Sequence, residues 1–288
     1  MSYIKTEGLT YVYSKGTPFE KKAIDNINIE IEQGEFVGII GHTGSGKSTF
    51  IQHLNGLLRP DAGKVYIDGK DIWADKSSLR AVRFKVGLVF QYPEYQLFEE
   101  TVYKDIAFGP RNMELTEQEI DRRVHEAAQL VGLREEHLTR SPFELSGGQK
   151  RRAAIAGVIA MEPRVLILDE PTAGLDPKGR DKILRQLHSY HEKTGSTVLI
   201  VSHSMEDIAK HCKKVLVLNK AQVYCYEPTD QVFSRAKELT EMGLNVPQVT
   251  RLAEKLASRG VDLGDDIYTV ERCKERLLML LKGVGSNA

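Results

Sequence analysis

Short, largely apolar runs alternate with amphipathic segments along most of this chain of 288 residues. Runs of four or five such residues are typical of strands that are buried on both faces of a sheet. They occur at residues 36–40, 86–90, 165–168 and 197–201. Since buried strands that alternate with helices form parallel sheets, the pattern predicts an α/β fold with a doubly wound sheet.

The N-terminal segment has a different pattern, because its apolar positions partly alternate with polar ones. We expect residues 3–6 and 28–32 to form an antiparallel pair ahead of the first buried strand, and residues 64–67 to add another strand. Tyr13 lies just before a loop that is rich in turn residues. Its ring either packs within a small sheet or stacks on a nucleotide base, and the sequence alone favours packing.

Helical periodicity dominates two other parts of the chain. Thr116 and Glu119 have the spacing of a capping box, and apolar residues then recur every three or four positions. With a second helix at 146–160, this segment indicates a helical insertion. Helical patterns at 249–257 and 270–281 predict a small C-terminal extension. It carries no chemical motif, so we expect a packing or dimerisation role.

The composition is that of an ordinary globular protein, with 41% hydrophobic and 28% charged residues. Lys plus Arg equals Asp plus Glu at 40 each, so no net charge attracts the chain to nucleic acid or to an anionic membrane. The three cysteines lack C-x-x-C spacing, which argues against a zinc site or a disulfide framework. No apolar run reaches the roughly 20 residues of a membrane span, and residues 1–16 do not resemble a signal peptide. Work at a membrane would therefore require an anchor elsewhere.

Residues 41–49 read GHTGSGKST and stand between a buried strand and a helix. This is the phosphate-binding loop pattern, in which glycines let backbone N–H groups point at phosphate oxygens beside a helix N-terminus. Lys47 is expected to reach the β- and γ-phosphates, Ser48 to bind Mg²⁺ and Thr49 to cap a phosphate oxygen. The loop residues expected around the nucleotide are Gly41, His42, Thr43, Gly44, Ser45, Gly46, Lys47, Ser48 and Thr49. A turn that is merely glycine-rich would not have this strand and helix context.

An acidic pair, Asp169-Glu170, follows the buried strand at 165–168. Open α/β sheets bind ligands at the carboxyl ends of their strands. We expect Asp169 to hold Mg²⁺, through water, and Glu170 to act as the general base on the attacking water. The alternative is an acidic helix cap, which the phosphate-binding loop upstream makes a poor explanation.

Residues 145–149, LSGGQ, form a second anion site at a helix N-terminus. One chain already has its phosphate loop, so a second loop needs an explanation. The string resembles the signature of the ATP-binding cassette (ABC) ATPases, and it lies between the phosphate loop and the acidic pair as in that family. There, two cassettes enclose two ATP molecules, and each site takes its signature from the other chain. The resemblance implies that Ser146, Gly147, Gly148 and Gln149 complete the partner's site.

The resemblance also implies roles for residues that no spacing explains. Tyr13 would stack on adenine, which reverses the packing preference given above. Gln91 would touch Mg²⁺ and water and sense the transport subunit, Asp176 would belong to the D-loop, and His203 would hold the γ-phosphate. The cofactors implied are ATP and Mg²⁺.

The family also implies a domain organisation. Residues 1–227 would form a P-loop ABC cassette with an antiparallel β subdomain and a helical subdomain at about 100–160. Residues 228–288 would form the helical extension.

Three strings extend the resemblance to the ATPase subunits of energy-coupling factor (ECF) transporters, and in particular to the second of the two paralogous ATPases of the vitamin-uptake group. They are GHTGSGKSTFIQHLNGLLRP, FQYPEYQLFEETVYKDIAFGP and FELSGGQKRRAAIAGVIAMEP. This implies a paralogous ATPase as partner, a transmembrane T component that docks at residues 91–109, and S components that capture vitamins or related micronutrients. The chain would then lie peripherally at the cytoplasmic face of the cell membrane. The aromatic residues of the docking segment either contact the T component or belong to the core; they are Tyr92, Tyr95, Phe98 and Phe108.

Three other functions are compatible with a phosphate-binding loop. One is the ATPase of another ABC transporter class, and another is a soluble ABC ATPase that acts on nucleic acid or ribosomes. The soluble types have long heptad segments between loop and signature or two cassettes per chain, and neither feature is present between Lys47 and Ser146 or elsewhere. We therefore expect no nucleic-acid partner. A kinase with the same loop would leave the signature and His203 unexplained.

Overall fold

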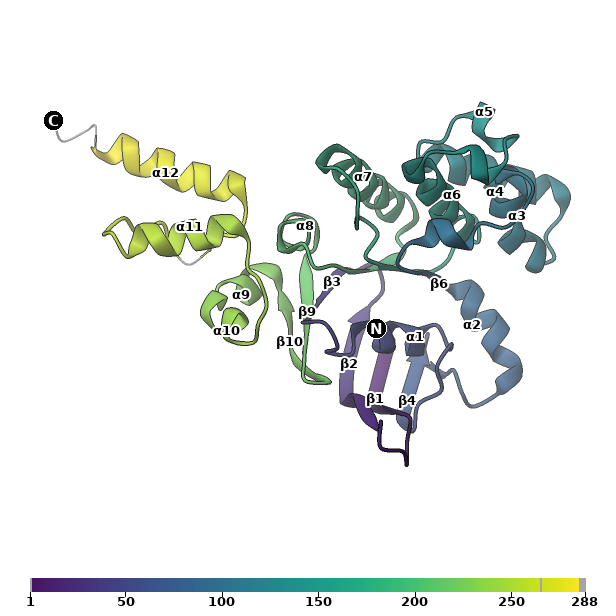
Figure 1. Cartoon of the computed structure of the whole chain (residues 1–288), viewed down its shortest axis with the longest axis horizontal. Coiled ribbons are helices and arrows are strands. Elements are labelled where there is room, and N and C mark those ends of the chain that lie inside the picture. The colour runs from purple at the N-terminus through teal and green to yellow at the C-terminus, as the bar shows by residue number, and fades with distance from the viewer. Residues whose placement is uncertain (1, 265, 285–288) are drawn as a thin grey trace.

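A six-stranded sheet forms the centre of the computed structural model, which describes residues 2–264 and 266–284 (Figure 1). Its strand order is β10-β9-β3-β8-β7-β6. All neighbours are parallel except β10 with β9. The bounds are β3 Phe36–Ile40, β6 Val86–Val89, β7 Val165–Asp169, β8 Thr197–Val201, β9 Lys214–Asn219 and β10 Gln222–Pro228. Every residue of β3, β7 and β8 is buried, which confirms the expected sheet with covered faces.

A second, antiparallel sheet contains the N-terminal strands in the order β2-β1-β4-β5. Its strands are β1 Ser2–Tyr13, β2 Lys21–Glu32, β4 Ala62–Ile67 and β5 Lys70–Asp71. The antiparallel pair is confirmed, but β1 and β2 are much longer than the residues 3–6 and 28–32 expected. Register shifts within the β1–β2 pair interrupt the alternation of apolar and polar residues, so the pattern hides part of each strand.

The helical insertion consists of α3 Val102–Asn112, α4 Glu117–Leu130, α5 Glu135–Leu138 and α6 Gly147–Ile159, which gather at one side of the molecule (Figure 1). The Thr116 hydroxyl caps α4 by accepting from the Glu119 N–H at 3.3 Å. Glu119 does not complete the expected capping box, because its carboxylate binds Arg122 and Arg123 instead. The remaining helices around the sheets are α1 Lys47–Leu54, α2 Leu79–Lys85, α7 Pro177–Thr194 and α8 Met205–His211.

The C-terminal part is helical, as expected, with α9 Thr229–Phe233, α10 Ala236–Glu241, α11 Gln248–Ala257 and α12 Val270–Val284. Figure 1 places α11 and α12 at the opposite end of the molecule from α4. A small hydrophobic cluster of Ala253, Leu263, Ile267 and Cys273 joins them and is separate from the two large cores. None of the helices within residues 2–264 and 266–284 is long and apolar enough to cross a membrane.

Candidate active site

The loop at residues 41–46 connects the buried strand β3 to α1, and two of its glycines are required by close contacts. A Cβ atom at Gly41 would lie 2.5 Å from the carbonyl oxygen of Leu218. At Gly46, where φ is 105°, a Cβ would collide with the Ala23 carbonyl oxygen. Left-handed backbone and close approach both favour glycine. The loop is therefore held tightly between β2 and β9 while its N–H groups are presented at the start of α1.

Lys47 is buried at the floor of this loop, with 7% of its surface exposed. Its Nζ donates to the carbonyl oxygens of Gly41 at 2.6 Å and His42 at 3.2 Å. Burial lowers the pKa of Lys47, and the nearby carboxylates of Glu170 and Asp169 oppose that shift. This ammonium donates its hydrogen bonds to loop carbonyl oxygens, so phosphate oxygens that enter the loop would bring a negative charge next to it.

Two oxygen atoms that could bind a metal lie together beside Lys47. The Ser48 hydroxyl donates a hydrogen bond to Asp169 Oδ2 at 3.0 Å. Burial raises the pKa of Asp169, and the hydrogen bond from Ser48 opposes the shift. Hydroxyl and carboxylate oxygens suit Mg²⁺, which keeps several waters and often completes its shell with substrate phosphates. In the described part of the chain no group of three or more His, Cys, Asp or Glu side chains is placed to hold a metal alone. The donor set fits a metal that is shared with a nucleotide.

Glu170 lies beside this pair, and its side chain has an oxygen without a partner. The residue has φ 52° and is 8% exposed, and its Oε1 is buried without a hydrogen bond. His203 Nε2 lies 3.6 Å from that oxygen. Burial raises the pKa of Glu170 to about 7, with the charge of Asp169 adding to the effect. A carboxylate with a pKa near 7 and an unpaired oxygen can accept a proton from water at neutral pH.

These groups line one cavity of about 260 Å³. Its lining residues are Tyr13, Lys21, Ala23, Thr43, Gly44, Gly46, Lys47, Ser48, Thr49, Gln91, Asp169, Glu170 and His203. Most of the residues expected around the nucleotide are thus brought together from separate segments. Three loop residues expected there, Gly41, His42 and Ser45, are not among the lining residues.

Lys21 and Ala23 were not predicted from the sequence. They enter the site because the register of β1 and β2 sets Lys21 opposite Tyr13. Lys21 and its neighbour Lys22 follow a turn and carry no local signal, so only the strand register could have identified Lys21. The Tyr13 ring packs against a neighbouring side chain and is also partly exposed to solvent. Its ring meets Tyr11 edge to face at 4.9 Å, its hydroxyl lies 3.3 Å from Thr49 Oγ1, and it is 39% exposed.

The second anion site does not share this cavity. Ser146 is the N-cap of α6, and it forms a capping box with Gln149: the Ser146 N–H donates to Gln149 Oε1 at 2.8 Å, and the Gln149 N–H donates to Ser146 Oγ at 3.4 Å. Ser146 and Gly147 are exposed, and no residue of 146–149 lines the cavity. Asp176 is likewise outside it, as the N-cap of α7 with its Oδ1 accepting from the Gly179 N–H at 2.9 Å.

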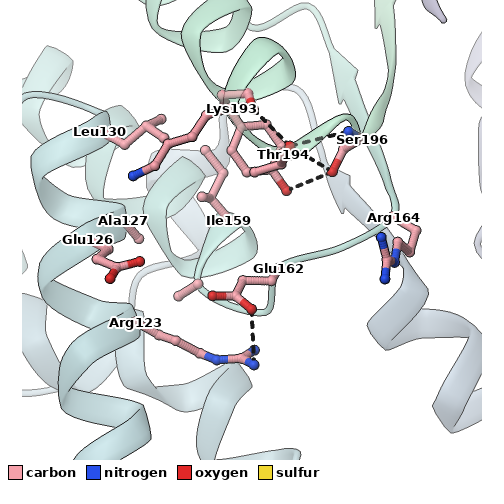
Figure 2. Close-up of a pocket in the computed structure, with 12 residues that line it drawn as sticks. Arg123, Glu126, Ala127, Leu130, Ile159, Glu162, Arg164, Lys193, Thr194 and Ser196 are labelled. Atoms are coloured by element: carbon pink, nitrogen blue, oxygen red, sulfur yellow. Dashed lines mark hydrogen bonds and ion pairs between the residues drawn. The ribbon is translucent and has the colours of Figure 1, made fainter. Parts of the chain in front are cut away.

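Another hollow, of about 270 Å³, lies between α4, the end of α6 and α7 (Figure 2). It contains cationic side chains but no glycine loop, and Arg123 at its edge is paired with Glu162 at 3.1 Å. The hydroxyls of Tyr190 and Ser196 both donate to the Pro163 carbonyl. This hollow has neither a glycine loop nor a hydroxyl–carboxylate pair like Ser48–Asp169, so it lacks the features that distinguish the cavity beside Lys47.

Comparisons with known proteins agree with this geometry. Residues 24–173 match the family model described as ABC transporter. The chain is 55% identical over 285 residues to the energy-coupling factor transporter ATP-binding protein EcfA2 of Clostridium tetani (strain Massachusetts / E88), covering 99% of each chain.

Two solved structures are similar. The structure of cbiO1 from Clostridium perfringens, described as part of the ABC transporter complex cbiONQ, has a TM-score of 0.75 and 39% identity over 88% of this chain and 99% of that one. The dimeric post-hydrolysis structure of the ATP-binding cassette MJ0796 with ADP and Pi has a TM-score of 0.71 and 31% identity, covering 78% of this chain and 98% of that one. The expected cassette fold is thereby confirmed, and the chain belongs to the ABC transporter family, in the group of energy-coupling factor transporter ATP-binding proteins.

Proposed function

We propose that this chain binds ATP with Mg²⁺ and hydrolyses it to drive import by an ECF-type transporter. The observation that carries the proposal is the single cavity in which Lys47, the Ser48–Asp169 pair and the unpaired Glu170 oxygen converge. Membership of the ABC transporter family and the similarity to EcfA2 support both the ATPase activity and its coupling to transport.

The residues of the cavity divide the reaction among them. Loop N–H groups and the Lys47 ammonium would bind the β- and γ-phosphates, and Ser48 and Asp169 would hold the metal. Mg²⁺, when bound, would neutralise charge that develops on the phosphate oxygens. Gln91 orients the attacking water, and Glu170 removes its proton. His203, whose Nε2 lies 3.6 Å from Glu170 Oε1, would contact the γ-phosphate.

Tyr13 is proposed as the adenine platform. Base stacking on an aromatic ring contributes about 1–3 kcal/mol, so Tyr13→Ala is expected to weaken ATP binding about tenfold. Tyr13→Phe keeps the ring and loses only the hydroxyl contact with Thr49, and should bind ATP nearly as well as the wild type. Both affinities can be measured by titration calorimetry. Equal losses in the two variants would show that the hydroxyl contact, and not stacking, is what matters.

A second cassette is proposed to complete the site. Residues Ser146, Gly147, Gly148 and Gln149 stand exposed or half-exposed at the start of α6, away from this chain's own cavity. In a facing pair each signature would reach the other chain's γ-phosphate, with Asp176 near the contact. MJ0796 was solved as a dimer, and the name EcfA2 implies a paralogue, so we propose a heterodimer. The division into a cassette at 1–227, with a helical subdomain at about 100–160, and an extension at 228–288 belongs to the same proposal.

The docking surface for the transmembrane T component is proposed at residues 91–109. Its four aromatic side chains are exposed rather than in the core: Tyr92 45%, Tyr95 86%, Phe98 60% and Phe108 46%. Aromatic side chains exposed together in this way are typical of protein contacts. Through the T component the chain would lie peripherally at the cytoplasmic face of the cell membrane and serve S components that capture vitamins or related micronutrients.

Mass spectrometry of what co-purifies with the tagged chain from gently solubilised native membranes tests this function. We expect a second ABC ATPase, a T-type membrane subunit and small capture proteins, whose identity would name the substrates. Recovery of a homodimer without membrane subunits would move the function to another transporter class. Recovery with ribosomes or nucleic acid would contradict the import function.

A further inference from the structure

The buried Arg151 forms a two-pronged ion pair with the half-buried Glu94, and the pair joins two parts of the chain far apart in sequence. Arg151 lies in the second turn of α6 and is 3% exposed. Its Nε donates to Glu94 Oε2 at 3.1 Å and its Nη2 to Glu94 Oε1 at 2.8 Å. Glu94 belongs to the short 3₁₀ helix Pro93–Gln96, three residues after Gln91. The geometry is the fork-to-carboxylate arrangement that only arginine offers.

The third nitrogen of the same guanidinium reaches a different segment. Nη1 donates to the carbonyl oxygens of Pro171, at 3.5 Å, and Ala173. These residues directly follow Glu170. The guanidinium also lies over the Tyr92 ring, 5.9 Å from its centroid. All three nitrogens of Arg151 are therefore committed, and each prong fixes a segment next to a residue of the proposed reaction.

The position of Arg151 on α6 adds a third connection. The helix opens at the exposed Ser146 and the half-buried Gln149, only a few positions before Arg151. Gln149 and Arg151 thus sit on the same rigid first turns of a helix. One side chain links the helix end that would face a partner cassette, the loop that carries Gln91 and the strand end that carries Glu170.

Fold stability is a poor explanation for this pair. A buried ion pair loses much hydration, and replacement by apolar residues is often neutral for stability. Burial raises the pKa of Glu94, yet the hydrogen bonds and charge of Arg151 outweigh it and hold the pKa below its usual value. The pair is thus charged, and its hydrogen bonds hold Arg151 in one orientation against two other segments. Such a pair can make those segments move together.

We infer that Arg151, held by Glu94, is a positioning residue that makes the Gln91 loop, the chain after Glu170 and the signature end of α6 move as one unit. ATP bound in this chain's own cavity then determines the position of residues 146–149 relative to the ATP site of the partner cassette. The inference rests on the proposed function. It adds a specific link between the two sites that neither the motifs nor the comparisons assign.

The test uses the full chain purified with its partner cassette and membrane subunits, and measures ATP hydrolysis and thermal unfolding. Glu94→Gln keeps the shape of the side chain and removes its charge. We expect kcat to fall about tenfold, a change of the size that coupling between contacting residues typically produces. KM for ATP should change by less than about twofold. The Hill coefficient for ATP should fall toward one, because the two sites lose their link.

Arg151→Met and its combination with Glu94→Gln complete a double-mutant cycle, and Arg151→Lys tests the charge by itself. Lysine retains the charge but not the fork, so it should restore little activity. The double variant should be no slower than the slower single variant, because the two residues act as one unit. Glu162→Gln is the matched control: it breaks the Arg123–Glu162 pair of Figure 2 and should leave kcat unchanged.

The outcomes separate the inference from the function on which it rests. A wild-type complex that hydrolyses no ATP overturns the proposed function and the inference together. An active wild type with Glu94→Gln within twofold of its kcat and Hill coefficient overturns the inference alone. A lower unfolding temperature with unchanged kcat would assign the pair a purely structural role, which also overturns it.

Discussion

Glu170→Gln is expected to lower ATP hydrolysis by about 10² to 10⁴ while ATP binding is retained. The amide has the shape of the carboxylate but cannot take a proton from water. Glu170 lines the cavity and its Oε1 is buried without a hydrogen bond, whereas Asp169, the other carboxylate among the lining residues, accepts from Ser48. Steady-state turnover and ATP affinity measured on the same preparation provide the check. Turnover near the wild-type rate would remove Glu170 from the role of base.

The same substitution should trap the closed pair of cassettes. If hydrolysis with phosphate release reopens the pair, a chain that binds ATP without cleaving it stays associated. Mass photometry with ATP should therefore show a larger fraction of associated cassettes for Glu170→Gln than for the wild type. Glu162→Gln removes a carboxylate outside the cavity, so it should match the wild type in both turnover and association.

Stability gives an independent measure of the environment of Glu170. Because burial raises its folded-state pKa to about 7 from an ordinary value of 4.5, the folded nucleotide-free chain holds a proton there that the unfolded chain releases. That contribution to stability is complete below pH 4.5 and is lost as the pH rises through 7. At pH 8, Glu170→Gln should then be more stable than the wild type by up to about 3 kcal/mol. The difference should vanish near pH 4.5, and a gain that is equal at both pH values would contradict this explanation.

Local signals predicted the parts of the site that depend on neighbours in the sequence. The loop from Gly41 to Thr49 needs glycines at fixed spacing between a buried strand and a helix, so its pattern and its structure coincide. The acidic pair at the end of β7 and the Ser146 cap of α6 are likewise local. Gln91 and His203 have no such signal, and only the family resemblance singled them out; the structure places both in the cavity.

Contacts between distant segments could not be predicted in this way. Lys21 and Ala23 reach the cavity through a strand pairing whose register is shifted by bulges. Glu94 and Arg151 are 57 residues apart, and neither is unusual in its own segment. The exposure of Tyr95 and Phe98 was also undecided from sequence, because aromatic residues are equally common in cores and interfaces.

The two anion sites explain each other once their positions are known. The phosphate loop at the start of α1 lines a cavity together with the buried Lys47, whereas Ser146 at the start of α6 is exposed. Gly147 has open space where a Cβ would stand, so the signature is accessible to a large ligand or a partner. On the proposed function, each chain would supply the phosphate loop of one ATP site and the signature of the other. This asymmetry is what a facing pair of cassettes would resolve.

Lys47→Ala is expected to weaken ATP binding roughly 10- to 100-fold, the loss of one or two hydrogen bonds to a charged group at about 1.5–3 kcal/mol. The effect differs from that of Glu170→Gln, because Lys47 acts on the bound phosphates and Glu170 on the attacking water. Titration calorimetry of both variants should accordingly show lost affinity in the first and retained affinity in the second. Unchanged affinity in Lys47→Ala would contradict the phosphate role.

The fold around Lys47 must be measured together with affinity. Removing the ammonium leaves the carbonyl oxygens of Gly41 and His42 without that donor, so the loop itself is expected to lose stability. Lys193→Ala is the matched control, since it removes a lysine from the hollow of Figure 2 and should change neither affinity nor unfolding. If Lys47→Ala unfolds at the wild-type temperature and still binds ATP weakly, the loss belongs to the phosphate contact alone. If the unfolding temperature and the ATP affinity both fall, the affinity must be corrected for the fraction of folded protein, because only folded protein binds ATP. The loss of affinity that remains after this correction is due to the phosphate contact.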